Sequence, residues 1–280
     1  MPHFNHYINW EKLKDGAYYL NRIPKIIHYC WFGGNPISEL GEKCIASWKK
    51  YCPEYEIIQW DEGNFDINCN QYAKEAYEAK KWAFVTDYVR LYVVYNHGGI
   101  YLDTDVELLK SFDDLLGYSG FMGFEDERNI NTGLGFGAVI NNNIIYEILR
   151  SYEKIPFIKE DGSLDLTPCP QRNTETLVER GLILNNTSQI IEDIIFLPTR
   201  YLSPKDYKSG KITIHKNTVS IHHFNASWYT EKQRNFHKKG VLYRNLFGKK
   251  IGGTLINLVF VINEYGFLEI LGKIMKKIKV

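Results

Sequence analysis

The sequence has almost no excess of charge of either sign. Its 34 Lys and Arg residues stand against 33 Asp and Glu residues, which leaves a formal net charge of +1 over 280 residues. A basic field of the kind that binds nucleic acid is therefore absent. The length suits one large domain with a substantial core, with room for an appendage.

Paired cysteines are also lacking. The five cysteines are odd in number and form no C-x-x-C pair: Cys30, Cys44, Cys52, Cys69 and Cys169. This pattern excludes a disulfide framework and a zinc ribbon, and it predicts reduced thiols. The opening residues "MPHFNHYINWEKLKDG" contain no apolar region, so we expect no secretory signal and a cytoplasmic location.

Aromatic residues, in contrast, are abundant: 20 Tyr, 15 Phe and 6 Trp. Their flat faces and polar edges suit sugar rings and nucleobases. The simpler interpretation, an aromatic core, explains the composition equally well.

The order of predicted elements indicates an α/β protein. Strands are expected over 23–34, 55–62 and 100–106, with helices over 38–53, 71–81 and 82–99 between them. Alternation of this kind predicts a parallel sheet with ligands beyond the carboxyl ends of its strands. Beyond residue 106, short strands at 119–126, 132–140, 193–198 and 212–224 and a helix at 143–155 predict a mixed or antiparallel half that covers one side of the cleft.

The stretch "GGIYLDTDVELL" places two carboxylates in an otherwise apolar run. If the strand continues through them, Asp103 and Asp105 share one face with Tyr101. Two like charges on one face need a positive partner, and hard oxygen ligands favour Mg²⁺ or Mn²⁺ with substrate phosphates. The pair therefore predicts a binding site for a metal diphosphate. The alternative is that the two aspartates only mark a solvent-exposed strand end, where D-x-D sequences are also common.

Two other interpretations use the same residues. "DTDV" after an apolar strand matches haloacid-dehalogenase phosphatases, in which the first Asp is a nucleophile. Those enzymes open with that strand, whereas Asp103 lies far from the N-terminus, and no later Gly-Asp-x-x-x-Asp follows. An EF-hand loop would need Gly where Leu108 stands, so that interpretation fails.

A family resemblance adds to these observations. The segment "FVTDYVRLYVVYNHGGIYLDTDVELLKSFDDLL", at residues 84–116, resembles the D-x-D sugar-binding region of glycosyltransferase family 32. Ordered similarities run from "IPKIIHYCWFGG" to "SIHHFNASW", over residues 23–228. The resemblance implies a GT-A fold, a nucleotide-sugar donor, Mn²⁺ or Mg²⁺, and retention of anomeric configuration.

The resemblance also implies roles for individual residues. Trp31 would stack on the nucleobase, Asp87 would bind sugar hydroxyls, and Arg90 would lie near sugar and phosphate. Tyr101 would contact the ribose or the diphosphate. Asp103 would bind ribose hydroxyls and the metal, and Asp105 would be the more direct metal ligand.

Further roles follow from later motifs of the same family. In "IHHFNASW", His223 is the preferred third metal ligand and His222 is the alternative. An imidazole ligand favours Mn²⁺ over Mg²⁺. Ser227 and Trp228 would close over the diphosphate. Asn131 would lie near the sugar, while Thr167 and Pro168 would shape the acceptor side.

The predicted organisation is a GT-A domain over 1–240 and a basic amphipathic segment over 241–280. The C-terminal stretch "KKIGGTLINLVFVINEYGFLEILGKIMKKIKV" has apolar runs much shorter than the ~20 residues of a spanning helix, with lysines at both ends. It predicts either a helix on an anionic membrane surface or a helix packed on the domain.

Together these features predict a retaining, metal-dependent hexosyltransferase of surface or capsular polysaccharide assembly, at the inner face of a bacterial membrane. The expected donor is a UDP-sugar such as UDP-galactose or UDP-glucose, and the expected acceptor is a glycan or lipid-linked oligosaccharide. A catalytically silent nucleotide-sugar or glycan-binding protein of the same fold is the alternative. Glu125 and Asp126 are the carboxylates considered for a covalent mechanism.

Overall fold

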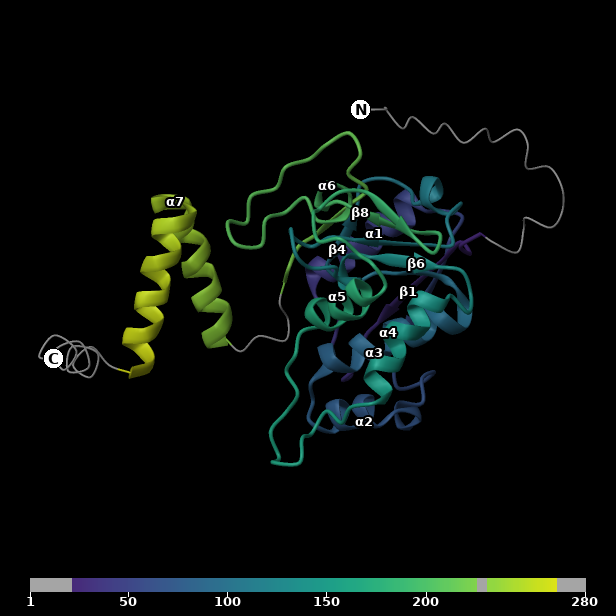
Figure 1. Cartoon of the computed structure of the whole chain (residues 1–280), viewed down its shortest axis with the longest axis horizontal. Coiled ribbons are helices and arrows are strands. Elements are labelled where there is room, and N and C mark those ends of the chain that lie inside the picture. Colours follow the sequence, from purple (N-terminus) through teal and green to yellow (C-terminus); the bar gives the residue numbers. More distant parts are fainter. Residues whose placement is uncertain (1–21, 226–230, 266–280) are drawn as a thin grey trace, which may run out of the picture.

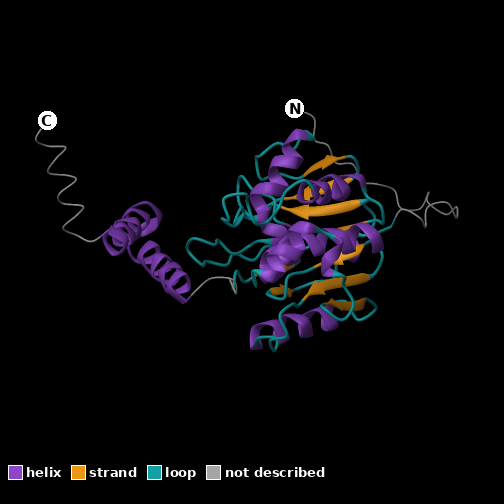
Figure 2. Cartoon of the chain, turned by 90° about the horizontal axis from the view of Figure 1, so that it is seen from below, coloured by secondary structure: helices purple, strands orange, loops and turns teal. Residues whose placement is uncertain are grey.

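The computed structural model describes residues 22–225 and 231–265, with side chains over 22–225 and 232–259. The predicted site residues Ser227 and Trp228 lie outside the described residues. Strands of one central sheet form a layer with helices packed against it, and helix α7 lies to one side of these packed helices and strands (Figures 1 and 2).

The first β-α-β unit consists of β1 (Ile26–Cys30), α1 (Glu39–Tyr51) and β2 (Glu56–Trp60). Helix α1 begins where the Ser38 hydroxyl accepts a hydrogen bond from the Gly41 backbone N–H, at 3.1 Å. The two strands are parallel, with Ile26 opposite Glu56. The chain therefore leaves β1 and β2 at the same edge of the sheet.

Two helices, α2 (Gln71–Glu78) and α3 (Trp82–His97), lead to strand β3 (Gly99–Tyr101). Gly98 adopts a left-handed conformation (φ 65°), and a Cβ there would stand 2.9 Å from Pro24 Cδ. Only glycine fits both the backbone angle and the space, so α3 can end and β3 begin with no intervening loop.

The remaining elements of the body are mostly short. They are β4 (Val106–Leu108), β5 (Gly120–Gly123), β6 (Phe136–Ala138), α4 (Asn143–Glu153), α5 (Cys169–Glu179), β7 (Gln189–Ile191), β8 (Ile194–Leu197), α6 (Thr199–Leu202) and β9 (Ser220–His222), with single 3₁₀ turns at Ile67–Cys69, Asp113–Leu115 and Thr132–Leu134.

The seven-stranded sheet has the order β2-β1-β3-β6-β5-β8-β7, and β4 pairs with β9 in a separate two-stranded sheet. Strands β2, β1 and β3 are parallel, whereas β6 is antiparallel to both β3 and β5. The predicted α/β class, parallel first half and mixed second half are confirmed. The architecture is consistent with the predicted GT-A fold followed by a C-terminal helix.

Two apolar clusters cover the faces of the sheet. Side chains of α2, α3 and α4 form one cluster, and side chains of α1, β4 and the Asp113–Leu115 turn form the other. Alternation along β1 divides its residues between them, with Ile27 and Tyr29 in one cluster and Cys30 in the other.

Two predicted strands differ in the structure. The strand expected over 100–106 ends at Tyr101, so Asp103 and Asp105 lie in the turn that follows it. The strand expected over 212–224 is limited to Ser220–His222, which pairs with β4; earlier in this stretch Ile212 forms only an isolated bridge with Lys205, and residues 211–216 stay exposed. All five cysteines are free.

Helix α7 (Glu231–Tyr265) consists of two arms that meet at Gly248, whose backbone (φ 77°, ψ 161°) is not helical. Lys249 Nζ lies 2.9 Å from Asp206 Oδ2, and Asn245 Nδ2 donates to the Ser209 carbonyl at 3.2 Å, so α7 contacts the loop after α6. The predicted boundary between 240 and 241 falls inside the first arm. Among the described residues, no helix is long and apolar enough to span a membrane.

Candidate active site

The two aspartates occupy the turn between β3 and β4, at the carboxyl end of a central strand. The Val106 backbone N–H donates to the Asp103 carbonyl at 3.0 Å and closes this turn. Strand β4 then runs in the second sheet, away from β3. Asp103 and Asp105 therefore stand where the two sheets part, the position at which open α/β sheets bind ligands.

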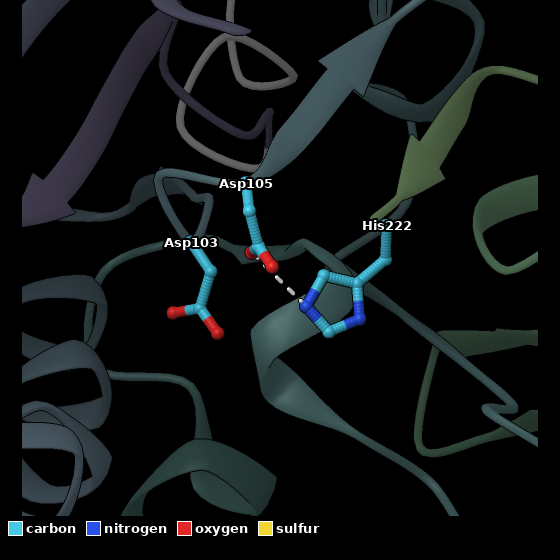
Figure 3. Close-up of side chains that lie close together, drawn as sticks. All are labelled: Asp103, Asp105 and His222. Atoms are coloured by element: carbon cyan, nitrogen blue, oxygen red, sulfur yellow. Dashed lines mark ion pairs between the residues drawn. The ribbon is translucent and has the colours of Figure 1, made fainter. Parts of the chain in front are cut away.

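A histidine that lies more than a hundred residues later in the sequence forms a cluster with Asp103 and Asp105. Ligand atoms of Asp103, Asp105 and His222 all lie within 4.8 Å of one another, and His222 Nε2 is 3.1 Å from Asp105 Oδ1 (Figure 3). Strand β9 supplies the histidine because it pairs antiparallel with β4, with Val106 opposite His222.

The structure brings His222, not the preferred His223, to the aspartates. His223 Nε2 lies 2.8 Å from Glu107 Oε2, on the other side of the β4–β9 pair. Adjacent residues of a strand face opposite ways, so the pairing of β9 with β4 decides which imidazole enters the cluster. The preference for His223 is corrected on this geometry, and the alternative ligand His222 takes its place.

Charge interactions favour an ionised pair in this cluster. His222 and the Asn225 backbone N–H, 2.7 Å from Asp105 Oδ2, hold the pKa of the Asp105 carboxyl at about 2 despite its burial. Asp105 in turn raises the pKa of His222 against the effect of burial. The His222 Nδ1 atom is buried and has no hydrogen-bond partner within the described ranges.

Two carboxylates and one imidazole make a donor set that fits a divalent cation. Carboxylate oxygens are the usual ligands of Mg²⁺ and Mn²⁺, and the imidazole shifts the preference toward Mn²⁺. A cation here would replace the His222 proton as the positive partner of both aspartates.

A buried cluster of Asp87, Arg90 and Tyr101 adjoins Asp103. Arg90 Nη2 lies 3.1 Å from Asp87 Oδ1 and 3.3 Å from Asp103 Oδ1, and the Tyr101 hydroxyl donates to Asp103 Oδ1 at 2.9 Å. Burial raises the pKa of Asp87 to about 6, although Arg90 opposes the shift. The Arg90 guanidinium therefore lies next to three of the predicted site residues, Asp87, Tyr101 and Asp103.

Asn131 adjoins this cluster through Cys169 and contacts Glu125, while its predicted place near the sugar stays a prediction. Its Nδ2 donates to Glu125 Oε2 at 2.5 Å, and its Oδ1 accepts from the Gly133 backbone N–H at 2.6 Å. Burial raises the pKa of Glu125, and the interactions with His222 and Asn131 partly oppose this rise.

Asp126, the other carboxylate considered for a covalent mechanism, accepts hydrogen bonds from the backbone of its own loop, at Arg128 and Asn129. Of the two carboxylates considered, only Glu125 contacts a site residue.

Cys169 is a site residue that the sequence did not single out. Its thiol lies 3.7 Å from Arg90 Nη1 and 3.5 Å from Asn131 Oδ1, at the start of α5. Burial raises the pKa of this thiol. Thr167 and Pro168 immediately precede it, so the segment assigned to the acceptor side does reach the site. Because nothing in the letters "TPCPQ" distinguishes a site cysteine from a core cysteine, only the fold identifies it.

Trp31 follows β1 at the same edge of the sheet. It is partly buried, and its indole N–H donates to the Asn35 carbonyl at 2.5 Å. Its stacking role stays a prediction, as do the roles assigned to the other site residues.

Part of the chain is similar to known glycosyltransferases. Residues 38–122 match the family described as "Glycosyltransferase sugar-binding region containing DXD motif". Inositol phosphoceramide mannosyltransferase 3 of Schizosaccharomyces pombe is 29% identical over 148 residues, which are 48% of this chain and 38% of the relative. A glycosyltransferase of Acanthamoeba polyphaga mimivirus is 25% identical over 199 residues, 68% of this chain and 76% of the relative. The chain thus matches well under half of the fungal enzyme's length.

Solved structures with some similarity include the PaToxG glycosyltransferase, at a TM-score of 0.45 and 20% identity over 58% of this chain and 71% of that chain. A glycosyltransferase involved in glycosylation of the major capsid of PBCV-1 has a TM-score of 0.42 and 13% identity, over 77% of this chain and 99% of that chain.

The matched region contains the D-x-D turn, and over this part the chain is similar to the sugar-binding region of glycosyltransferases. The resemblance to glycosyltransferase family 32 that the sequence indicated is confirmed.

Proposed function

We propose that this protein is a retaining, metal-dependent glycosyltransferase that moves a hexose from a nucleotide sugar to a glycan or lipid-linked oligosaccharide. The observation that carries the proposal is the convergence of Asp103, Asp105 and His222 beside the Asp87–Arg90 pair. One group of residues can hold a cation and its diphosphate, and the other offers polar atoms to the sugar.

The residues of the site have separate tasks in this proposal. Asp103, Asp105 and His222 would hold the cation, which would neutralise the departing diphosphate. Arg90 fixes the carboxylates of Asp87 and Asp103, so that Asp87 presents oxygen to sugar hydroxyls in one orientation. Asn131 adjoins this group through the Cys169 thiol.

Retention of configuration is compatible with two routes. In front-side attack the leaving phosphate takes the acceptor proton, and no protein base is needed. A double displacement needs a carboxylate under the anomeric carbon, and Glu125 is the candidate because Asn131 holds it at the site.

The test is nucleotide release from a panel of UDP- and GDP-sugars, with Mn²⁺, with Mg²⁺ and with EDTA. Release from one donor that stops with EDTA would support the proposal and identify the sugar. Metal-dependent binding without release would favour the silent binding protein of the same fold. No binding and no release with any donor would overturn the proposal.

A glycine next to Asp103 provides a check on the site geometry. A Cβ on Gly133 would overlap Asp103 Oδ2 and stand 3.0 Å from Asn131 Oδ1. Because a misplaced group near the chemistry can cost about 10²-fold in rate, we expect Gly133→Ala to lower kcat/KM by about that factor. Gly63→Ala, whose Cβ would meet only Asp61 in its own loop, should keep full activity. Equal activity of the two variants would contradict the placement of Asp103.

We also propose that the protein works in surface or capsular polysaccharide assembly, at the inner face of a bacterial membrane. Around Gly248 the side chains of Leu246, Phe247 and Ile251 are 67%, 49% and 62% exposed, next to Lys249 and Lys250. Apolar and basic residues together suit an anionic membrane surface. The full chain should float with anionic vesicles and not with neutral ones; flotation with neither would reject the membrane contact.

A further inference from the structure

The imidazole of His222 lacks the hydrogen bond that usually orients a metal-binding histidine. Its Nε2 faces Asp105 Oδ1 at 3.1 Å, which leaves Nδ1 as the second ring nitrogen (Figure 3). Nδ1 is buried, and among the described residues it meets no hydrogen-bond partner. Metal-binding histidines almost always donate this second N–H to a carboxylate, a backbone carbonyl or water, which fixes the plane of the ring. Another kind of contact must therefore hold the ring of His222.

The ring of Phe224 lies against this imidazole. The two ring centroids are 4.2 Å apart, at an interplanar angle of 56°. Phe224 also has a left-handed backbone conformation (φ 53°), which is rare for a bulky residue. Strain of this kind persists only where the surrounding structure enforces it, and it is concentrated at functional sites. The contact between the two rings is therefore kept at a conformational cost.

Hydrogen bonds on both sides of Phe224 enforce its conformation. The His223 carbonyl accepts a hydrogen bond from Lys205 Nζ at 2.5 Å. The Asn225 backbone N–H donates to Asp105 Oδ2 at 2.7 Å. The left-handed residue thus lies between two anchored neighbours, and its ring is held on the imidazole two residues earlier.

A second aromatic residue, Tyr207, supports Phe224 from the loop after α6. Its ring meets the Phe224 ring edge to face, with centroids 5.3 Å apart. On Tyr207 in turn packs the imidazole of His237, from the first arm of α7, with centroids 4.4 Å apart. Ring contacts therefore run without a break from α7 through Tyr207 and Phe224 to His222.

Helix α7 is also fixed to the loop that carries Tyr207. The salt bridge of Lys249 and the hydrogen bond of Asn245 come from the two arms of the helix, and they reach this loop at positions 206 and 209. The position of Tyr207, and with it the support of the His222 ring, therefore depends on α7.

We propose that Phe224 is the positioning residue of His222, and that Tyr207 and His237 make α7 part of the support of the metal site. The inference rests on the proposed function, because His222 is a ligand of the cation that the proposed function requires. It gives α7 a task at the active site that is separate from contact with a membrane.

The experiment is a titration of the full chain with Mn²⁺, followed by the electron paramagnetic resonance signal of the free ion. Replacing an outer contact of a metal ligand costs about 10–100-fold in metal affinity, so we expect Phe224→Ala to weaken Mn²⁺ binding about tenfold or more. Phe224→Tyr keeps the ring and should bind Mn²⁺ with nearly the wild-type affinity. Phe247→Ala, at a half-exposed phenylalanine of α7 outside these ring contacts, is the matched control and should bind as the wild type does.

A further variant separates the ring from simple filling of space. Phe224→Leu keeps an apolar side chain at the position but offers no flat ring to the imidazole. It should bind Mn²⁺ nearly as weakly as Phe224→Ala, and urea unfolding of the metal-free proteins shows that each variant is folded. Wild-type affinity in a folded Phe224→Ala or Phe224→Leu protein would overturn the role of Phe224.

His237→Ala tests the link to α7. It leaves every residue of the metal site in place and removes the ring that packs on Tyr207. Because it acts through two intervening rings, we expect it to weaken Mn²⁺ binding less than Phe224→Ala does. Equal affinity of His237→Ala and the Phe247→Ala control would overturn the link.

Failure of this inference can be distinguished from failure of the proposed function. If the wild type binds Mn²⁺ and none of these variants weakens binding, the metal site remains and the positioning role is overturned. If the wild type binds no Mn²⁺, both are overturned.

Discussion

Asp105→Asn is expected to lower kcat/KM for nucleotide-sugar turnover by about 10²–10³-fold, the size of effect seen when a charge-stabilising group is removed from an active site. Asn has the same shape as Asp but no charge. It gives up the ion pair with His222 (3.1 Å) and the proposed metal ligand, while its carbonyl can still accept from the Asn225 N–H. The measurement is initial rate of nucleotide release over a range of Mn²⁺ concentrations.

The control for this variant is Asp114→Asn, which removes the same charge from an exposed position away from the cluster. It should retain the wild-type rate. If Asp105→Asn also retained that rate at low Mn²⁺, the cluster of Asp103, Asp105 and His222 could not be the metal site.

Arg90→Ala is expected to lower the free energy of unfolding by about 3–5 kcal/mol at pH 8, because it leaves two carboxylates without their shared cation. The guanidinium side chain is only 4% exposed, and it contacts both Asp87 and Asp103. Urea unfolding gives the measurement. The control is Arg150→Ala, which removes an exposed ion pair between Arg150 Nε and Glu153 Oε2 (3.9 Å). It should lower the free energy of unfolding by less than about 1 kcal/mol.

The pH dependence of the Arg90→Ala effect has a definite sign. Without the cation, the pKa of Asp87, already about 6 in the folded protein, rises further, while its unfolded value stays near 4. The folded variant therefore binds protons that the unfolded chain does not, and acid stabilises it relative to the wild type. The loss of stability should be smaller at pH 5 than at pH 8; an equal loss at both would mean that the carboxylates are not the cause.

Much of the first half of the fold follows from local sequence. Helix α1 has a Ser cap and apolar residues at helical spacing, and Gly98 marks the end of α3, so each element carries its own start or stop signal. The second half depends on pairing between distant segments. No local signal predicts that β6 lies between β3 and β5, because a strand of three residues can pair on either side of several neighbours.

The site shows the same division. Asp87 and Arg90 are one helical turn apart, and Asp103 and Asp105 one residue apart, so their proximity could be predicted from spacing. The choice between His222 and His223 could not, since it depends on the register of β9 against β4.

The two-stranded ladder of β4 and β9 brings together the two parts of the site that lie farthest apart in the sequence. Asp105 and His222 are joined through a long stretch of chain, and only three residue pairs hold β9 in register. Closing so long a loop has an entropic cost that few contacts offset. A cation that bridges the two strands would stabilise this ladder by mass action. We expect amide hydrogens of Ser220–His222 to exchange faster than those of the central strands in metal-free protein, and to slow selectively when Mn²⁺ is added. The β4–β9 ladder would then be the part of the active site that opens locally, while the central sheet stays folded.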